Sequence, residues 1–298
     1  MRISSNSDYL NAMAGIEKAA AELARWQARV ASGRRVNSPA DDPAAAARSV
    51  EEHAEIGNLE QYARTTELAA TRLSAVDSVL SDIVARLTAA RTSATAALGT
   101  GPTQASREAV ARELEGIADA LLSDIRCNVR GTYVFSGSAA LTGPYERLAD
   151  GSVSGYLGDG NGMSVDIDRT RSVVVSFDAT DITQGGDPGD VFTVLSQLAA
   201  AVRAGDQAGM TTGIEGLKRA FDRAVAFQTA VGTDLASLSD QGLRLSALRQ
   251  AAVARVSKDE DVNLAEAISR MARADTAYQA ALSAIGTRSR LTLLDYLR

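Results

Sequence analysis

The sequence is poor in the residues that build disulfides, metal centres and most catalytic sites. Its 298 residues include one cysteine, Cys127, and one histidine, His53. A single cysteine excludes an internal disulfide and a CxxC zinc site, and histidine-dependent triads and metal sites lack their partners. We therefore expect no catalysis, no metal and no cofactor. Cys127 is predicted to be a small buried residue on a helix, and His53 to be solvated among glutamates.

Aromatic residues, clustered positive charge and long apolar runs are scarce as well. Aromatic residues make up 4% of the chain although 45% is hydrophobic, and the formal net charge is −6. The absence of a Lys/Arg block argues against nucleic acid and anionic membranes as partners. No run approaches the ~18 apolar residues of a membrane span. The start, MRISSNSDYL, lacks a secretory signal core, which predicts a cytoplasmic protein unless a dedicated channel exports it.

Seven-residue apolar repeats are the strongest pattern that is present. A helix is predicted over about residues 5–32, and another over 44–98 that carries two seam positions of a coiled coil. A third, over about 106–130, would form an antiparallel hairpin with the second. The first helix repeats Tyr9, Ile16, Leu23 and Val30, with Met13 beside them; the second repeats Leu59, Thr66, Leu73, Leu80, Leu87 and Ala94, and Tyr62, Ala69, Val76, Ile83, Ala90 and Ala97.

The middle of the chain changes character. Residues 131–189 are rich in glycine and alternate β-prone with polar residues, and the Gly-Asp-Gly-Asn-Gly run at 158–162 predicts a hairpin turn. Helix is expected again from 190, over 207–231, and in a long segment beyond. The last helix begins near Asn263; its apolar residues are Leu264, Met271, Tyr278 and Ile285, then Ile268 and Leu282, and in the tail Leu291 and Leu294.

These patterns predict a mainly α protein with a β-rich insert, in which the N- and C-terminal halves form a long antiparallel helical bundle or coiled coil. We expect an N-terminal assembly helix and turn (1–43), two parts of a helical rod (44–130 and 190–261), a β-rich domain (131–189) and a C-terminal assembly helix (262–298). The apolar stripes at both ends must be buried against something, and helices of other copies could complete that burial. An ordinary internal core and an intersubunit coiled coil explain the heptads equally well.

The sharpest local feature is the segment between the first two helices. Gly33 can end a helix in the left-handed conformation, and Asn37-Ser38-Pro39 favours a turn. Asp42 followed by Pro43 is typical of a helix start. Asp41 and Asp42 could also be a carboxylate pair for acid–base chemistry, but adjacent carboxylates at a helix start usually serve as caps.

The run from Ala31 to Arg48 resembles the N-terminal signature of the flagellin superfamily, SG-x-R-x-NS-x-x-DD-A. Pro39 and Pro43 make it more similar to the hook-associated proteins of the FlgL type, which join hook to filament. The residues that carry the signature are Gly33, Arg34, Asn37, Pro39, Asp41, Asp42 and Pro43. Two further segments, 131–138 and 261–297, are similar to the same proteins at the entry to their outer β domain and in their C-terminal helix.

The resemblance implies a structural subunit of the bacterial flagellum and not an enzyme. In this family the terminal helices line the inner tube, the long helices form the next shell, and the β domain faces outward. The implied partners are further copies in a ring, a hook-associated protein on the hook side, flagellin on the filament side, and an export chaperone of the FlgN type on the C-terminal helix. Export would use the flagellar type III channel without a cleavable signal, giving an extracellular location.

Two other interpretations stay open. The chain could be flagellin itself, although the two prolines and the tail at Asp295-Tyr296-Leu297 argue against this. It could also be an intracellular coiled-coil scaffold, which would show heptads without the paired terminal signatures. An enzyme of unknown type is the weakest alternative, because no set of residues can be named as its site.

Overall fold

The computed structural model describes residues 2–99, 101, 103–149 and 151–296, and the side chains from residue 10 to residue 286 within them. The chain divides into two compact units. Unit 1 comprises Met1–Leu59 and Ala247–Arg298, and unit 2 comprises Glu60–Ser246. Each unit is described by itself.

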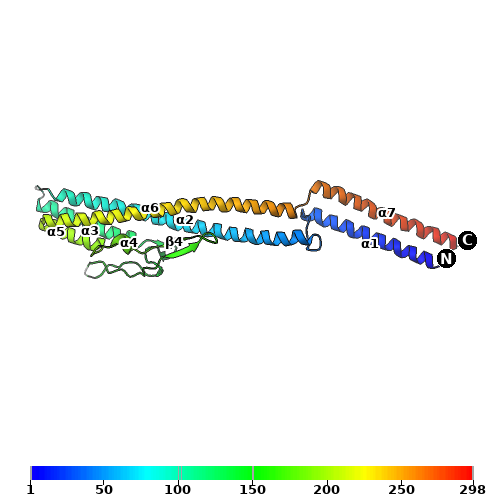
Figure 1. Cartoon of the computed structure of the whole chain (residues 1–298), viewed down its shortest axis with the longest axis horizontal. Helices are drawn as coiled ribbons and strands as arrows, with labels where there is room; N and C mark the ends of the chain where they lie inside the picture. Colours follow the sequence, from blue (N-terminus) through cyan, green and yellow to red (C-terminus); the bar gives the residue numbers. More distant parts are fainter. Residues whose placement is uncertain (1, 100, 102, 150, 297–298) are drawn as a thin grey trace. The chain divides into compact units, whose positions relative to one another are not determined.

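Unit 1 is built from the two terminal helices and the adjoining ends of the two longest helices. Helix α1 (Arg2–Ser32) lies beside α7 (Leu264–Tyr296), with both chain ends at the same end of the pair (Figure 1). The unit also holds the first turns of α2 (Pro43–Ala97) and the last turns of α6 (Gln207–Glu260). Two short connectors therefore meet here, one between α1 and α2 and one between α6 and α7.

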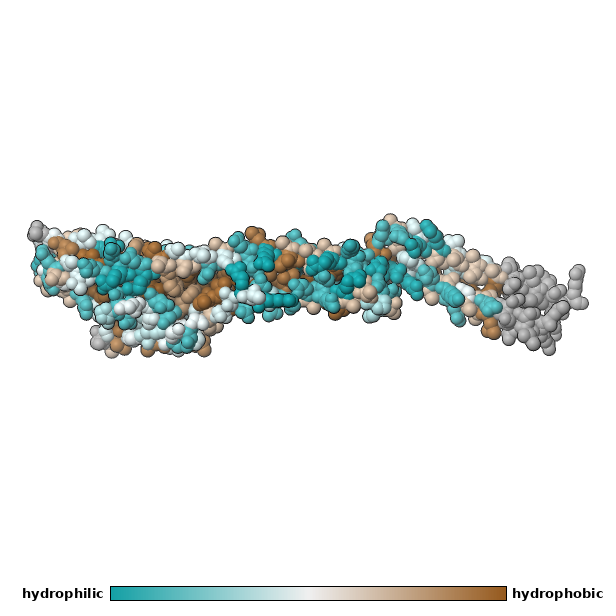
Figure 2. All heavy atoms as spheres, in the orientation of Figure 1, coloured by the Kyte–Doolittle hydropathy of each residue, from teal (hydrophilic) through white to brown (hydrophobic). Residues whose placement is uncertain are grey.

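Unit 2 holds a helical core made by α2 and α6 with α3 (Gln104–Ile125) and α5 (Val191–Ala204). The predicted seam of α2 is confirmed, since all its positions are buried except the half-buried Tyr62. Helix α6 has its own unbroken heptad: Met210, Leu217, Ala224, Val231, Leu238, Leu245 and Ala252, all buried. Small and medium side chains thus fill a long, narrow core. Some hydrophobic residues are nevertheless exposed between hydrophilic ones on the face of the helices that Figure 2 shows.

Three details of the helices differ from expectation. Helix α6 is continuous to Glu260, whereas the sequence predicted an end near Val231; the heptad simply continues through Gly232. Helix α3 ends at Ile125 rather than at Arg130. Cys127 consequently lies beyond the helix and is half-buried, not fully buried on a helical face, and burial raises the pKa of its thiol.

Among the described residues, the β region consists of two separate two-stranded sheets, not one larger sheet. Strand β1 (Asn128–Val129) pairs with β2 (Thr132–Tyr133), and β3 (Met163–Asp166) pairs with β4 (Ser172–Ser176), both antiparallel. A short helix, α4 (Thr180–Thr183), follows. The hairpin turn predicted at 158–162 is wrong, because that segment lies before β3 and the β3–β4 turn comes after Asp166.

The 158–162 segment instead packs against the chain after β2. The Asp159 carboxylate accepts hydrogen bonds from the backbone N–H groups of Ser138 (2.6 Å) and Ala139 (3.3 Å). Gly137 has φ +65°, and a Cβ there would lie 2.4 Å from Asp159 Oδ1. Glycine is therefore required at this close approach. The glycines that resembled a hairpin signal serve this contact between loops.

Buried aromatic side chains join the β region to the helices. Tyr145 is buried, its ring meets Phe192 of α5 edge-on at 5.3 Å between centroids, and its hydroxyl lies 2.7 Å from Thr183 Oγ1. Burial raises the pKa of Tyr145 to about 12. Aromatic residues, rare in the sequence, thus pack against one another where the β region meets the helices.

Candidate assembly site

The connector between α1 and α2 forms the turn that the sequence predicted. Gly33 adopts φ +71° and its N–H donates to the Arg29 carbonyl at 3.0 Å, as a left-handed helix end requires. Asp42 Oδ1 accepts the Ala45 N–H at 3.0 Å, and α2 begins at Pro43. Asp42 is therefore a helix cap, not half of a catalytic pair. The Ala45 bond and the Arg35 side chain hold the pKa of Asp42 below its usual value.

Asp41 organises the interior of the same turn. Its Oδ2 accepts the backbone N–H groups of Asn37 (3.2 Å) and Ser38 (3.1 Å), and its Oδ1 lies 3.7 Å from Arg29 Nη2. Desolvation alone would raise the pKa of Asp41, but the two backbone bonds, the Ser38 hydroxyl and the Arg29 charge together outweigh it and the pKa is lowered. An ionised Asp41 thus holds the predicted signature in one conformation. Pro39 lies exposed within it.

The two connectors are hydrogen-bonded to each other. The Gly33 carbonyl accepts the Val262 N–H at 3.0 Å, and the Arg35 N–H donates to the Glu260 carbonyl at 2.6 Å. The Arg35 guanidinium reaches the Asp259 carbonyl at 2.7 Å. Segments more than 220 residues apart therefore form a single junction.

Two carboxylates at the end of α6 form ion pairs with the arginines of this region. Asp259 forms a two-bond ion pair with Arg48 on α2 (2.8 and 3.0 Å). Glu260, only 8% exposed, accepts the Ser49 hydroxyl, and lies 2.9 Å from His53 Nε2 and 3.4 Å from Arg34 Nη1.

We call this set the turn network: Arg34, Arg35, Asp41, Asp42, Arg48, Ser49, His53, Asp259 and Glu260. Hydrogen bonds from Ser49 and His53 keep the pKa of Glu260 below its usual value, despite burial. The bond from Arg48 does the same to the pKa of Asp259. Sequence reasoning found the turn residues but missed Arg48, Ser49, Asp259 and Glu260, and it took His53 to be merely solvated.

The coil of α1 and α7 buries part of the predicted stripes. Ile16, Leu23 and Val30 on α1 are half-buried, as are Met271, Tyr278 and Ile285 on α7. The most buried side chains of α7 are alanines, Ala267 and Ala274. Some of the candidate assembly residues are therefore partly buried in the narrow seam between α1 and α7.

The other part is left uncovered. Met13, Leu264, Ile268 and Leu282 are exposed, together with Leu10, which the sequence analysis had not singled out. Predicted residues Tyr9, Leu291 and Leu294 have side chains outside the described set. The terminal helices therefore carry apolar side chains that nothing within the described chain covers.

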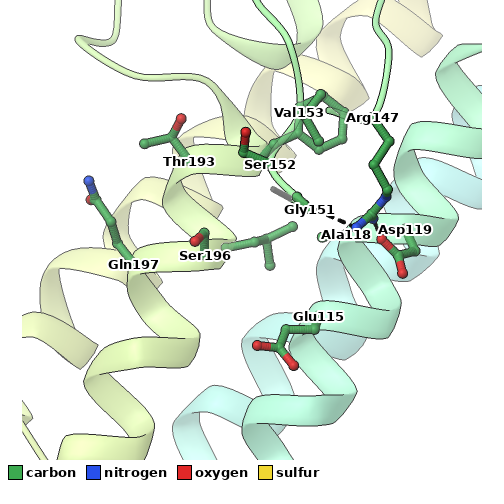
Figure 3. Close-up of a pocket in the computed structure, with 12 residues that line it drawn as sticks. Glu115, Ala118, Asp119, Arg147, Gly151, Ser152, Val153, Thr193, Ser196 and Gln197 are labelled. Atoms are coloured by element: carbon green, nitrogen blue, oxygen red, sulfur yellow. Dashed lines mark hydrogen bonds and ion pairs between the residues drawn. The ribbon is translucent and has the colours of Figure 1, made fainter. Parts of the chain in front are cut away.

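A separate pocket of about 590 Å³ lies in unit 2, between α3, α5 and the 147–153 loop (Figure 3). Asp119 pairs with Arg147 at its rim, and Glu115 lies 2.7 Å from Arg203. Ser152, Thr193, Ser196 and Gln197 complete a polar lining. Its charged groups are already paired, so it presents no constellation for catalysis.

Two kinds of feature are absent from the part of the chain that the structure describes. Within it, no helix combines the length and apolarity needed to cross a membrane. His, Cys, Asp and Glu side chains also form no group of three or more that could hold a metal ion.

Comparison with known proteins places this geometry in context. Residues 3–140, which include the turn signature, match the family model for the bacterial flagellin N-terminal helical region. Flagellar hook-associated protein 3 of Salmonella typhimurium is 25% identical over 80% of this chain and 81% of its own length. The Escherichia coli protein of the same name is 24% identical over 98% of both chains. This chain resembles flagellar hook-associated protein 3.

The fold agrees with that resemblance. The flagellar junction protein FlgL of Legionella pneumophila superposes with a TM-score of 0.61, at 13% identity, over 72% of this chain and all of the other. This chain is mainly helical with a small antiparallel β region in the middle, and it shares this fold with the FlgL structure. Its relatives indicate a structural role in the flagellum.

Proposed function

We propose that this chain is the structural subunit that joins the flagellar hook to the filament, and that it is not an enzyme. The observation that carries the proposal is the uncovered apolar side chains on both terminal helices, in a chain whose relatives are hook-associated proteins. In a single chain, the exposed side chains of Leu264, Ile268 and Leu282 contribute little burial free energy. Helices of neighbouring copies would bury the part that is still exposed, about half of each side chain, so each leucine or isoleucine contributes about 0.7–1.5 kcal/mol, half the value for full burial.

Assembly then follows from burial. Copies form a ring in the flagellar axis, with a hook-associated protein on the hook side and flagellin on the filament side. The subunit is extracellular and leaves the cell through the flagellar type III channel without a cleavable signal. Before export, a chaperone of the FlgN type covers the C-terminal helix, including its apolar residues from Leu264 to Leu294.

The ordering of the ends is part of the proposal. The described seam between α1 and α7 is narrow, so folding of the two ends is completed when other copies cover the outer apolar side chains. The predicted domains 1–43 and 262–298 would act as assembly segments, 44–130 and 190–261 as the rod, and 131–189 as the outward-facing part.

The test is a clean deletion of the gene, scored for swimming, attached filaments and flagellin in the medium. We expect non-motile cells that carry hooks and release unpolymerised flagellin. Restoring the gene should restore filaments, which controls for effects on neighbouring genes. Unchanged swimming would overturn the proposal.

Flagellin is the second candidate, because residues 3–140 match the flagellin N-terminal helical region. The same deletion separates the two functions. Loss of a filament subunit would leave hooks without filaments and without flagellin in the medium.

A further inference from the structure

The seam between α1 and α7 is poorly suited to fixing how the two helices align along their length. Its inward-facing residues repeat every seven positions, and the alanines Ala12 and Ala19 on α1 and Ala267, Ala274 and Ala281 on α7 alternate with larger apolar residues at the same spacing: Ile16, Leu23 and Val30 on α1, and Met271, Tyr278 and Ile285 on α7. Alanines repeated at heptad spacing fit one another almost equally well after a shift of seven residues. A unique contact is needed where such a coil has to adopt one register.

Trp26 provides a contact of that kind. It is the single tryptophan of the chain, and two guanidinium groups lie over its ring, with Arg29 Cζ at 4.9 Å and Arg270 Cζ at 5.3 Å from the ring centroid. Arg270 comes from α7, so the contact crosses the coil. Such cation–π contacts depend on position and orientation, unlike apolar burial.

Both partners of the ring are themselves held in place. Two bonds to Glu266 Oε1 (2.7 and 3.0 Å) fix the Arg270 guanidinium, and the indole N–H donates to Glu22 Oε1 at 2.8 Å. Arg29 lies 3.7 Å from Asp41, which organises the turn. The cross-helix contact is thereby tied to the turn network through Arg29.

We propose that Trp26 is the positioning residue that sets the register of α1 against α7 in the assembled subunit. This inference rests on the proposed function, because the register matters where terminal helices of many copies must present identical faces. A chain whose coil shifts by one heptad would place its outer apolar residues about 10 Å away from those of its neighbours.

The register can be read by disulfide cross-linking. Because α1 and α7 run antiparallel and Trp26 contacts Arg270, the spacing places Leu23 level with Arg273, whose neighbour Ala274 is the buried seam residue there. Ala281 lies one heptad further. Leu23→Cys is combined with Ala274→Cys in one chain and with Ala281→Cys in another, both in a Cys127→Ser background. Cells carrying each variant supply isolated flagella, and the purified full chain is oxidised in parallel.

With Trp26 present, we expect the 23–274 pair to cross-link in preference to the 23–281 pair. Trp26→Leu should raise the ratio of shifted to native cross-link by roughly two- to fivefold, the equivalent of one exposed cation–π contact. Trp26→Phe, which keeps an aromatic face, should restore most of the native ratio. Phe221→Leu is the matched control, since it removes the cation–π contact with Arg91 in unit 2.

An unchanged ratio in Trp26→Leu would overturn the inference and assign the register to the turn network. Failure of the proposed function looks different: the chain would be missing from isolated flagella in every variant, including the one with Trp26 intact. In that case the ratio of shifted to native cross-link is read in the purified chain instead. If Trp26→Leu leaves that ratio unchanged, the inference is overturned as well.

Discussion

Glu260 shows how one side chain can be central to a site and yet invisible to sequence reasoning. It is buried at the end of α6 and receives Ser49, His53 and Arg34 from segments more than 200 residues earlier. Asp259, Glu260 and Asp261 place negative charge at a helix C-terminus, where the macrodipole disfavours it. This unfavourable placement could have indicated the site from the sequence, because carboxylates at a helix C-terminus need cations nearby to stabilise them.

Replacing Glu260 tests the turn network directly. Glu260→Gln should weaken the junction by about 1–2 kcal/mol, because Ser49, His53 and Arg34 lose a charged acceptor. The measurement is amide hydrogen exchange at Arg35 and Val262, whose N–H groups bond across the connectors; both should exchange faster. Glu113→Gln, which loses only a contact with Ser93 in unit 2, is the control. Equal protection in the two variants would contradict the assigned role.

The same carboxylate predicts a pH dependence. Because the pKa of Glu260 is lower in the folded chain than the ordinary glutamate value of 4.5, its contribution to stability is complete above about pH 4.5. It is lost as pH falls through the folded pKa. Protection at Val262 should therefore decline on acidification below pH 4.5, and less steeply in Glu260→Gln, where Asp259 still titrates with a lowered pKa.

At the scale of elements, helix α6 contains glycines with opposite consequences. Gly232 has open space around its missing Cβ, whereas a Cβ on Gly213 would lie 2.9 Å from Leu198 Cδ1 and 3.0 Å from its Cβ. Gly232→Ala should raise the free energy of unfolding by up to about 1 kcal/mol through helix propensity. Gly213→Ala should be at least about 1 kcal/mol less stable than Gly232→Ala, because the buried Leu198 must move. Denaturant unfolding of the two variants checks the difference, and equal stability would refute it.

Elements were predictable where the pattern was local. The α2 seam, the Gly33 helix end and the Asp42-Pro43 helix start follow from spacing and capping alone. The heptad of α6 was missed because Ala224 and Ala252 look unremarkable as seam residues and the helix was expected to end near Val231. The β pairings were not recoverable, since strands of two to five residues are set by contacts with distant segments such as Asp159 with Ser138.

For the whole molecule, the exposed apolar side chains of α7 should matter to assembly and not to folding of the chain. Leu264→Ser combined with Leu282→Ser should leave the free energy of unfolding within about 1 kcal/mol of the parent, about 0.5 kcal/mol for each surface substitution. Because 51% of Leu264 and 44% of Leu282 are exposed in the single chain, the same pair would lose about 1.5–3 kcal/mol of burial per subunit in the assembled state, so attached filaments should become rare. Swimming and electron microscopy measure the second effect.

A matched control is available in the β region. Leu141 is 84% exposed, so Leu141→Ser removes a comparable apolar group far from α7 in sequence. It should leave filaments intact. Normal swimming of the α7 double variant would show that other residues hold the copies together.

Trp26 makes the chain's intrinsic tryptophan fluorescence specific to one place in the fold. The chain has one indole, and that indole lies on the contact between the two terminal helices. Its fluorescence therefore comes from the α1–α7 pair alone, with no label attached. Emission wavelength and quenching by a soluble agent would report, in the native chain and in real time, when the two ends of the subunit come together.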